Sequence, residues 1–147
     1  AALWWGGISG LSFVAVPTLF ASFGSPTLAG PVAARLFSLQ CWAGLLFGLV
    51  LLLLLRSERG QRDGEKASPE EADRLRRNLV SMGWVLLAMI LALLQELGVA
   101  QRIVTARATG GDLRLWHTLG SLMVLGQWVC AGVLLWRLSA AQAAAQR

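Results

Sequence analysis

The run LFSLQCWAGLLFGLVLLLLL, from Leu36 to Leu55, decides the fold of this chain. Ser38 and Gln40 are its clearly polar members, and no charged residue interrupts it. A helix of about 20 apolar residues is long enough to cross the roughly 30 Å hydrocarbon core of a bilayer. Because lipid offers no partner for backbone amides, each amide must bond within the segment. We therefore expect a transmembrane helix here.

Three further apolar segments of similar length accompany this run, at about 3–23, 79–100 and 115–136. Hydrophobic residues make up 56% of the chain and charged residues 14%, against about 25% charged in soluble domains. The segments are also longer than the strands of a membrane barrel. The sequence thus predicts an all-α fold, an integral membrane four-helix bundle forming a single transmembrane domain over residues 1–147. The first segment has no basic leader or cleavage site, so we expect a retained span.

The links between the segments suggest how the helices connect. The stretch GSPTLAGP at 24–31 is rich in turn residues and predicts a tight antiparallel hairpin. Residues 109–112, TGGD, offer a glycine for a left-handed helix end and Asp112 as the cap of the last helix. In the polar stretch 56–78, Ser68 and Glu71 can form a capping box, so we expect the third helix to begin near Pro69.

Basic residues predict the orientation of this bundle. With the 56–78 loop and both termini on one side, that side carries nine basic residues: Arg56, Arg59, Arg62, Lys66, Arg74, Arg76, Arg77, Arg137 and Arg147. The other side carries four: Arg35, Arg102, Arg107 and Arg114. Because cytoplasmic loops hold the excess of Lys and Arg, we expect cytoplasmic termini and a cytoplasmic loop at 56–78. The expected location is the bacterial inner membrane, as a multi-pass protein.

Small residues supply the predicted packing faces. Helices in lipid associate largely through close contact of small side chains, since the hydrophobic effect does little between them. Each helix offers such a pattern, and we expect most of these faces to be internal: Gly6 and Gly10, Gly44 and Gly48, Ala88 and Ala92, and Gly126 with Cys130. Pro17 removes one helical hydrogen bond, which predicts a kink in the first helix.

A second group of residues forms a candidate polar cluster in the outer third of the bundle: Arg35, Gln40, Cys41, Glu96 and His117. Ionisable residues at membrane depth are unfavourable and mark function by default. We expect Glu96 to pair with Arg35 or His117, since a neighbouring cation favours the charged carboxylate. One interpretation is a structural ion pair or interfacial anchor. The other is a ligand, proton or metal role for Glu96 and His117.

Other function classes find little support in the residues. The chain contains no Ser/His/Asp set and no glycine-rich phosphate loop, so we predict that it is not an enzyme. Cys41 and Cys130 lie in apolar runs without metal-ligand spacing, and we assign no cofactor. A haem held by His117 and a symmetry mate is a weaker alternative. The net charge of +5 suits an anionic membrane surface, and we predict no nucleic-acid partner.

Several motifs resemble a known family. They are LWWGG at 3–7, FVAVPTLF at 13–20, AG at 29–30, ARLF at 34–37 and LWH at 115–117. Together they are similar to a bacterial family of small four-helix membrane proteins of unknown function. That family is distantly similar to copper-resistance protein D and to a human transmembrane protein linked to cisplatin resistance. The resemblance implies the fold and assigns no activity.

Two functions remain open from the sequence. The first is an accessory or scaffolding subunit of a larger membrane complex, because the chain is small and has more packing faces than four helices can bury. Its partners would be the lipid bilayer and either other membrane subunits or further copies of the chain. The alternative is transport or handling of a metal ion or small solute through the outer polar cluster.

Overall fold

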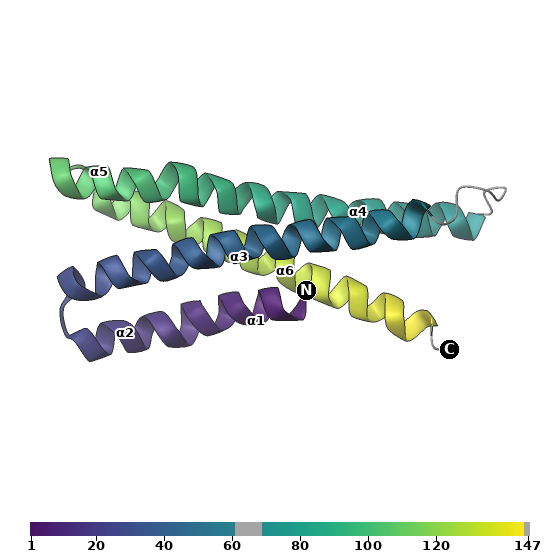
Figure 1. The fold of residues 1–147 in the computed structure, drawn as a ribbon, viewed down its shortest axis with the longest axis horizontal. Helices are drawn as coiled ribbons and strands as arrows, with labels where there is room; N and C mark the ends of the chain where they lie inside the picture. The colour runs from purple at the N-terminus through teal and green to yellow at the C-terminus, as the bar shows by residue number, and fades with distance from the viewer. Residues whose placement is uncertain (61–68, 146–147) are drawn as a thin grey trace.

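The computed structural model describes residues 1–60 and 69–145, and this part of the chain is all-helical (Figure 1). Four helices are long and apolar enough to cross a membrane: Ala2–Phe23, Pro26–Ser57, Glu71–Thr109 and Leu113–Ala143. Each is longer than the roughly 20 residues that the hydrocarbon core requires. The structure thus confirms four helices whose length and composition allow them to span a membrane.

The first helix is interrupted by a short wider turn. It consists of α1 (Ala2–Gly10), the π-helical segment η1 (Leu11–Ala15) and α2 (Val16–Phe23). The amide of Val16 bonds to the carbonyl of Leu11, five residues earlier, where an α-helix would use the fourth. Pro17 follows directly and has no amide hydrogen to give. The structure therefore places a π turn just before the proline at which the sequence predicts a kink.

The hairpin link is shorter than the predicted stretch 24–31. The second helix, α3 (Pro26–Gly60), already begins at Pro26, so only Gly24 and Ser25 separate the two helices. Gly24 takes the left-handed conformation with φ of 60°, and the carbonyl of Ser25 accepts the amide of Ala29. Proline suits the first helical position because its φ is already helical. Pro31 lies inside α3 and not in the turn.

The third helix begins where the sequence predicts. It consists of α4 (Pro69–Leu93), the π-helical segment η2 (Leu94–Ala100) and α5 (Gln101–Thr109). The predicted cap at Ser68 lies outside the described residues. Gly110 ends α5 in the left-handed conformation, with φ of 77°. Asp112 Oδ1 then accepts the amide of Leu115 at 3.0 Å and caps α6 (Leu113–Ala145), so both cap predictions for this link are confirmed.

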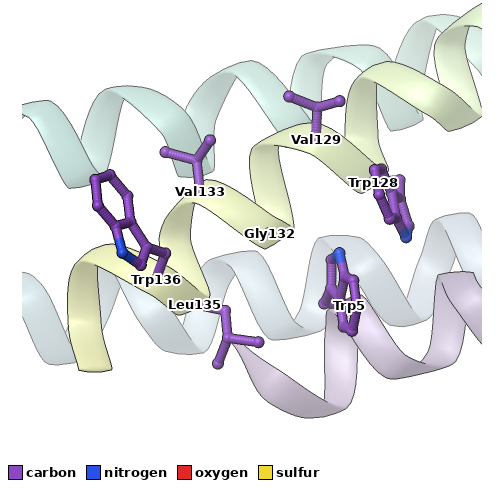
Figure 2. A pocket seen from close by; sticks show the side chains of 7 residues that line it. All are labelled: Trp5, Trp128, Val129, Gly132, Val133, Leu135 and Trp136. Carbon is purple, nitrogen blue, oxygen red and sulfur yellow. The ribbon is translucent and has the colours of Figure 1, made fainter. Parts of the chain in front are cut away.

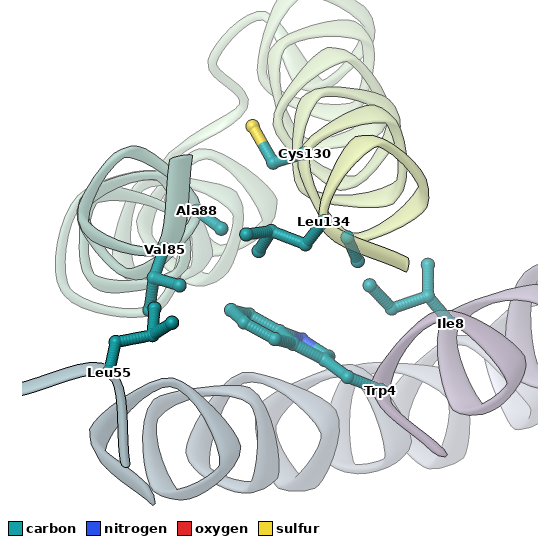
Figure 3. Close-up of a cluster of buried hydrophobic side chains, with 8 residues drawn as sticks. Trp4, Ile8, Leu55, Val85, Ala88, Cys130 and Leu134 are labelled. Carbon is teal, nitrogen blue, oxygen red and sulfur yellow. The ribbon is translucent and has the colours of Figure 1, made fainter. Parts of the chain in front are cut away.

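The helices pack unequally. α4 packs against both α3 and α6, and α1 packs against α6 and α3. α2, by contrast, makes its main contacts with α3 and η1. Figure 3 shows the buried cluster between them, with the Trp4 ring reaching from α1 toward the other helices and Leu134 and Cys130 approaching from α6.

Glycines set the closest approaches between helices. A Cβ added at Gly44 would lie 2.9 Å from Trp4 Nε1, and one at Gly48 would lie 2.6 Å from Met89 Cγ. At Gly126 it would lie 2.8 Å from Leu91 Cδ1. These three predicted packing glycines thus lie against neighbouring helices, as do the fully buried alanines Ala88 and Ala92.

Gly6 and Gly10 differ from that expectation. A Cβ added at either position would meet nothing within 4 Å, and both residues are exposed. Trp4 and Ile8, which are 2% and 1% exposed, occupy the inward side of α1 instead. Residues 6 and 10 lie on the opposite side of the helix from residues 4 and 8, because successive residues are rotated by about 100°. The small-residue face of α1 therefore points away from the bundle.

Candidate functional site

The residues of the predicted polar cluster differ in burial and form an exposed group and an inner group. Arg35 and His117 are exposed. Cys41 is completely buried, and Gln40 and Glu96 are half-buried. Two of the five predicted residues are therefore exposed, and the other three lie at least partly within the bundle.

Glu96 is held by a hydroxyl group and not by a cation. Ser38 Oγ on α3 donates a hydrogen bond of 2.6 Å to Glu96 Oε1 on η2. Within residues 1–60 and 69–145, no ion pair joins Glu96 to Arg35 or His117, so the predicted pairing is wrong. Long cationic side chains near helix ends can extend toward water, and Arg35 and His117 are both exposed.

Two glutamines form a second polar link. Gln127 Nε2 on α6 donates to Gln95 Oε1 on η2 at 2.7 Å. Gln95 is 7% exposed and Gln127 is not exposed at all. Sequence reasoning did not select this pair as site residues. The available signal was simply an amide side chain within each of two apolar spans, and such side chains bond across helices when buried in membranes.

These contacts lie at one level of the bundle. Glu96 follows Gln95 directly, and Gln40 lies two residues from Ser38, which is about 3 Å along a helix axis. The Ser38–Glu96 and Gln95–Gln127 bonds thus bring α3, η2 and α6 together at this level. We call this group the polar layer: Ser38, Gln40, Gln95, Glu96 and Gln127.

The polar layer coincides with the π-helical segment of the third helix. Gln95 and Glu96 both lie in η2. π turns are rare and frequently occur at functional sites, because they re-aim side chains relative to the rest of the helix. In the first helix, η1 carries Ser12, whose buried hydroxyl has no hydrogen-bond partner in the described structure. One turn earlier, Ser9 accepts a bond of 2.9 Å from Trp128 Nε1.

The two ends of the bundle carry separate arginine contacts. Arg137 donates to the carbonyl of Arg77 at 3.3 Å and to Ser81 Oγ at 3.4 Å, about two to three turns after the start of α4. At the other end, the Arg102 guanidinium lies 5.7 Å from the centre of the Trp116 ring. That distance is within cation–π range. The basic residues therefore gather at both ends, and the polar layer lies between them.

A shallow apolar groove runs along α6 at the side of α1 (Figure 2). Its volume is about 430 Å³, and tryptophan rings border it, including Trp5, Trp128 and Trp136. The centres of the Trp5 and Trp128 rings are 5.5 Å apart. Gly132 allows this approach, because an added Cβ there would lie 3.0 Å from Trp5 Nε1. The groove offers apolar contact and no polar chemistry.

The donor set of the polar layer supports hydrogen bonding. It combines one carboxyl group with three amides and a hydroxyl. Nowhere in the described ranges do three or more His, Cys, Asp or Glu side chains come together as metal ligands would. Neutral amides and hydroxyls are suited to binding neutral polar groups, since they supply both donors and acceptors.

Comparisons with known proteins give a family and no activity. The model of a family described as "Domain of unknown function (DUF4149)" matches residues 1–112, which run from α1 to the cap of α6. Neither the curated proteins nor the solved structures contain a match to this chain. The family match covers three of the four long helices. The chain belongs to the DUF4149 family, whose function is unknown.

Proposed function

We propose that this protein is an accessory or scaffolding subunit of a larger complex in the bacterial inner membrane. One feature carries the proposal, an exposed face of the first helix that we call the outward α1 face. It consists of Leu3, Gly6, Gly7 and Gly10 on α1, with Val14 on η1. Leu3 is 78% exposed and Val14 is 64% exposed. The three glycines between them leave a flat strip along the helix.

No described residue packs against the three glycines of this strip. A Cβ added at Gly6, Gly7 or Gly10 would meet nothing within 4 Å. Glycine within a helix is about 1 kcal/mol less favourable than alanine, so its use here calls for a reason outside the bundle. In membranes, small residues let a second helix approach the backbone closely. A transmembrane helix of a partner subunit would meet that requirement.

The second half of the same helix supports this reading. α2 contains no buried residue, although Phe20 and Phe23 are large and apolar. They are 38% and 46% exposed. The first helix is thus held to the bundle through the inward side of α1 and through the contacts of α2 with α3. A partner packed along α1 and α2 would complete its surroundings.

The proposal places the chain as an antiparallel bundle with both termini in the cytoplasm. Arg137 contacts Arg77 and Ser81, which supports grouping the last helix end with the basic 56–78 stretch. Nine basic residues then face the cytoplasm and four face the opposite side. Such an excess is typical of the cytoplasmic side of a membrane protein.

Labelling of an introduced cysteine tests this orientation. We expect Gly64→Cys to react with a membrane-impermeant maleimide in inverted inner-membrane vesicles and not in spheroplasts. The native thiols of Cys41 and Cys130 are 0% and 2% exposed, so unmodified protein serves as the background control. Rapid labelling in intact spheroplasts would show the opposite orientation, with the polar layer nearer the inner leaflet.

Assembly tests the subunit proposal. We expect Gly10→Leu to shift the protein from a large complex to its free form on native gels of mildly solubilised membranes. The added side chain protrudes from the outward α1 face and separates the two helices by blocking backbone approach. The bundle itself should keep its unfolding midpoint, because no described residue lies within 4 Å of a Cβ added at this position.

The matched control is Gly83→Leu on α4. Gly83 also has nothing within 4 Å of an added Cβ, but it lies on another helix. This variant should remain in the complex. Equal loss of assembly in both variants would show a general effect of bulky residues, and unchanged assembly of Gly10→Leu would remove the outward α1 face from the proposal. Purified protein that runs as a single species larger than a monomer would identify the partner as a further copy of the chain.

The expected resemblance to copper-resistance protein D and to the human cisplatin-linked protein, which no match among the curated proteins supports, carries no part of this proposal. Copper sites need several suitable ligands at fixed distances. The single histidine of the chain, His117, is exposed, while Cys41 is buried on a different helix. The subunit proposal therefore assigns no metal.

A further inference from the structure

The interior of the bundle contains polar atoms that the protein does not satisfy. Gln40 Nε2, Gln40 Oε1 and Gln127 Oε1 are buried without a hydrogen-bond partner among the described residues. Trp4 Nε1 and Ser12 Oγ are in the same state. Nearly all buried polar groups in native proteins are hydrogen-bonded to protein or to ordered water. Six such atoms occur among the described residues, and the five other than Asn78 Oδ1 call for a common explanation.

Contacts between the helices place these atoms near one another along the bundle. Trp4 Nε1 lies 2.9 Å from the position of a Cβ at Gly44, and Gln40 is one helical turn from Gly44 on the same side of α3. Gln127 is joined to Gln95, the residue before Glu96, and Glu96 is joined to Ser38 on α3. The unsatisfied atoms of Trp4, Gln40 and Gln127 therefore lie at or within about one turn of the polar layer. Ser12 lies one turn after Ser9, which accepts a hydrogen bond from Trp128, the neighbour of Gln127.

The chemistry of these atoms selects a ligand class. The indole of Trp4 and the amide nitrogen of Gln40 donate, whereas the carbonyl oxygens of Gln40 and Gln127 accept. An anion would be repelled by the two carbonyl oxygens, and a cation would be repelled by the two N–H donors. A neutral molecule that both donates and accepts suits all of them. Because Ile8 and Cys41 beside this level are 1% and 0% exposed, the site is enclosed.

We propose that the polar layer is a hydrated site, in which bound water molecules bridge Gln40 to the Gln95–Gln127 pair and to Trp4 and Ser12. Water is the smallest molecule that supplies both donors and acceptors, and buried waters typically make about three hydrogen bonds. The site goes beyond the subunit proposal, because it lies inside the bundle and does not use the outward α1 face.

Replacement of Gln40 by methionine distinguishes a hydrated interior from a dry one. Methionine has a similar length and no hydrogen-bonding amide. In a dry interior, Gln40→Met removes two unsatisfied polar atoms and raises the unfolding midpoint, because such atoms destabilise the folded state. In a hydrated interior it breaks the bridges to Gln127 and Trp4, and the unfolding midpoint falls. We expect the fall, and a rise would overturn the proposal.

The control for this substitution is Gln101→Met on α5, where the glutamine is exposed. It should leave the unfolding midpoint nearly unchanged, which shows that the exchange of side chains is itself tolerated. If the unfolding midpoint of Gln101→Met fell equally far, methionine itself would be the cause, and the proposal would be overturned as well.

Radiolytic hydroxyl-radical footprinting of the unchanged protein needs no variant to fold. The radicals form from water at the site of oxidation, so a residue beside bound water is modified even when bulk solvent cannot reach it. We expect Trp4, which is 2% exposed, to be oxidised readily. In Gln40→Met the oxidation of Trp4 should fall several-fold, while that of the exposed Trp136 stays constant. Protection of Trp4 in the unchanged protein would overturn the proposal.

Discussion

Gly48→Leu should strongly destabilise the bundle. A Cβ at this position would already lie 2.6 Å from Met89 Cγ and 2.7 Å from its sulfur, so α3 and α4 must move apart to admit a leucine. Overpacking of a well-packed interior costs about 1–3 kcal/mol. We expect a corresponding loss in the free energy of unfolding, measured by SDS titration of the protein in mild detergent micelles.

Two matched variants give this result its meaning. Leu52→Ala removes a half-buried side chain from the same helix and should destabilise less than Gly48→Leu. Gly83→Leu adds the same side chain where nothing lies within 4 Å and should have little effect. If Gly48→Leu and Gly83→Leu were tolerated equally well, α3 and α4 would not approach each other at Gly48.

Removal of the hydroxyl at Ser38 is the second substitution with a large expected effect. Ser38→Ala leaves Glu96 Oε1 without its 2.6 Å donor in a half-buried position between α3 and η2. Hydrogen bonds to charged groups contribute about 1.5–3 kcal/mol, and those to neutral groups about 1 kcal/mol. We expect the free energy of unfolding to decrease by an amount in this range, measured in the same titration.

A double-mutant cycle isolates the contact itself. The combined variant Ser38→Ala/Glu96→Gln should lose less stability than the two single variants together, because each removes the same bond. Ser22→Ala is the control, since its hydroxyl bonds to the carbonyl of Thr18 on the exposed surface of one helix. Strict additivity of Ser38→Ala and Glu96→Gln would show that the two residues are not coupled.

Length and hydropathy were sufficient to predict the four long helices, because a membrane imposes a minimum length on any apolar helix. The helix ends were harder to predict. Pro26 begins α3 and Pro31 continues it, although both lie in a stretch that resembles a turn. Proline near a helix start removes few hydrogen bonds, so composition alone does not distinguish a link from a first turn. Gly110 and Asp112 were predictable because each has a specific role in capping.

The partners of the polar residues could not be predicted in the same way. The depth of Glu96 follows from its position in the span, but its partner depends on how the helices are rotated. Ser38 faces Glu96, whereas Arg35, only three residues away, is exposed. The π turn at η2 shifts the faces of the third helix by an amount that a regular period does not include. A single sequence therefore gives depth in the membrane more readily than it gives contacts across it.

The π turn at Leu94–Ala100 also has a consequence for how this chain can vary in length. A π turn holds an additional residue compared with an α turn. Deletion of one residue within it would restore regular α-helix and keep the residues on both sides facing nearly their present directions, because the π turn is what accommodates the additional residue. The end of the third helix that carries Arg102 would then keep its alignment with Trp116 on α6. The segment is therefore a position at which the third helix tolerates the loss of one residue, whereas a deletion within α4 would turn one part of the helix by about 100° relative to the other.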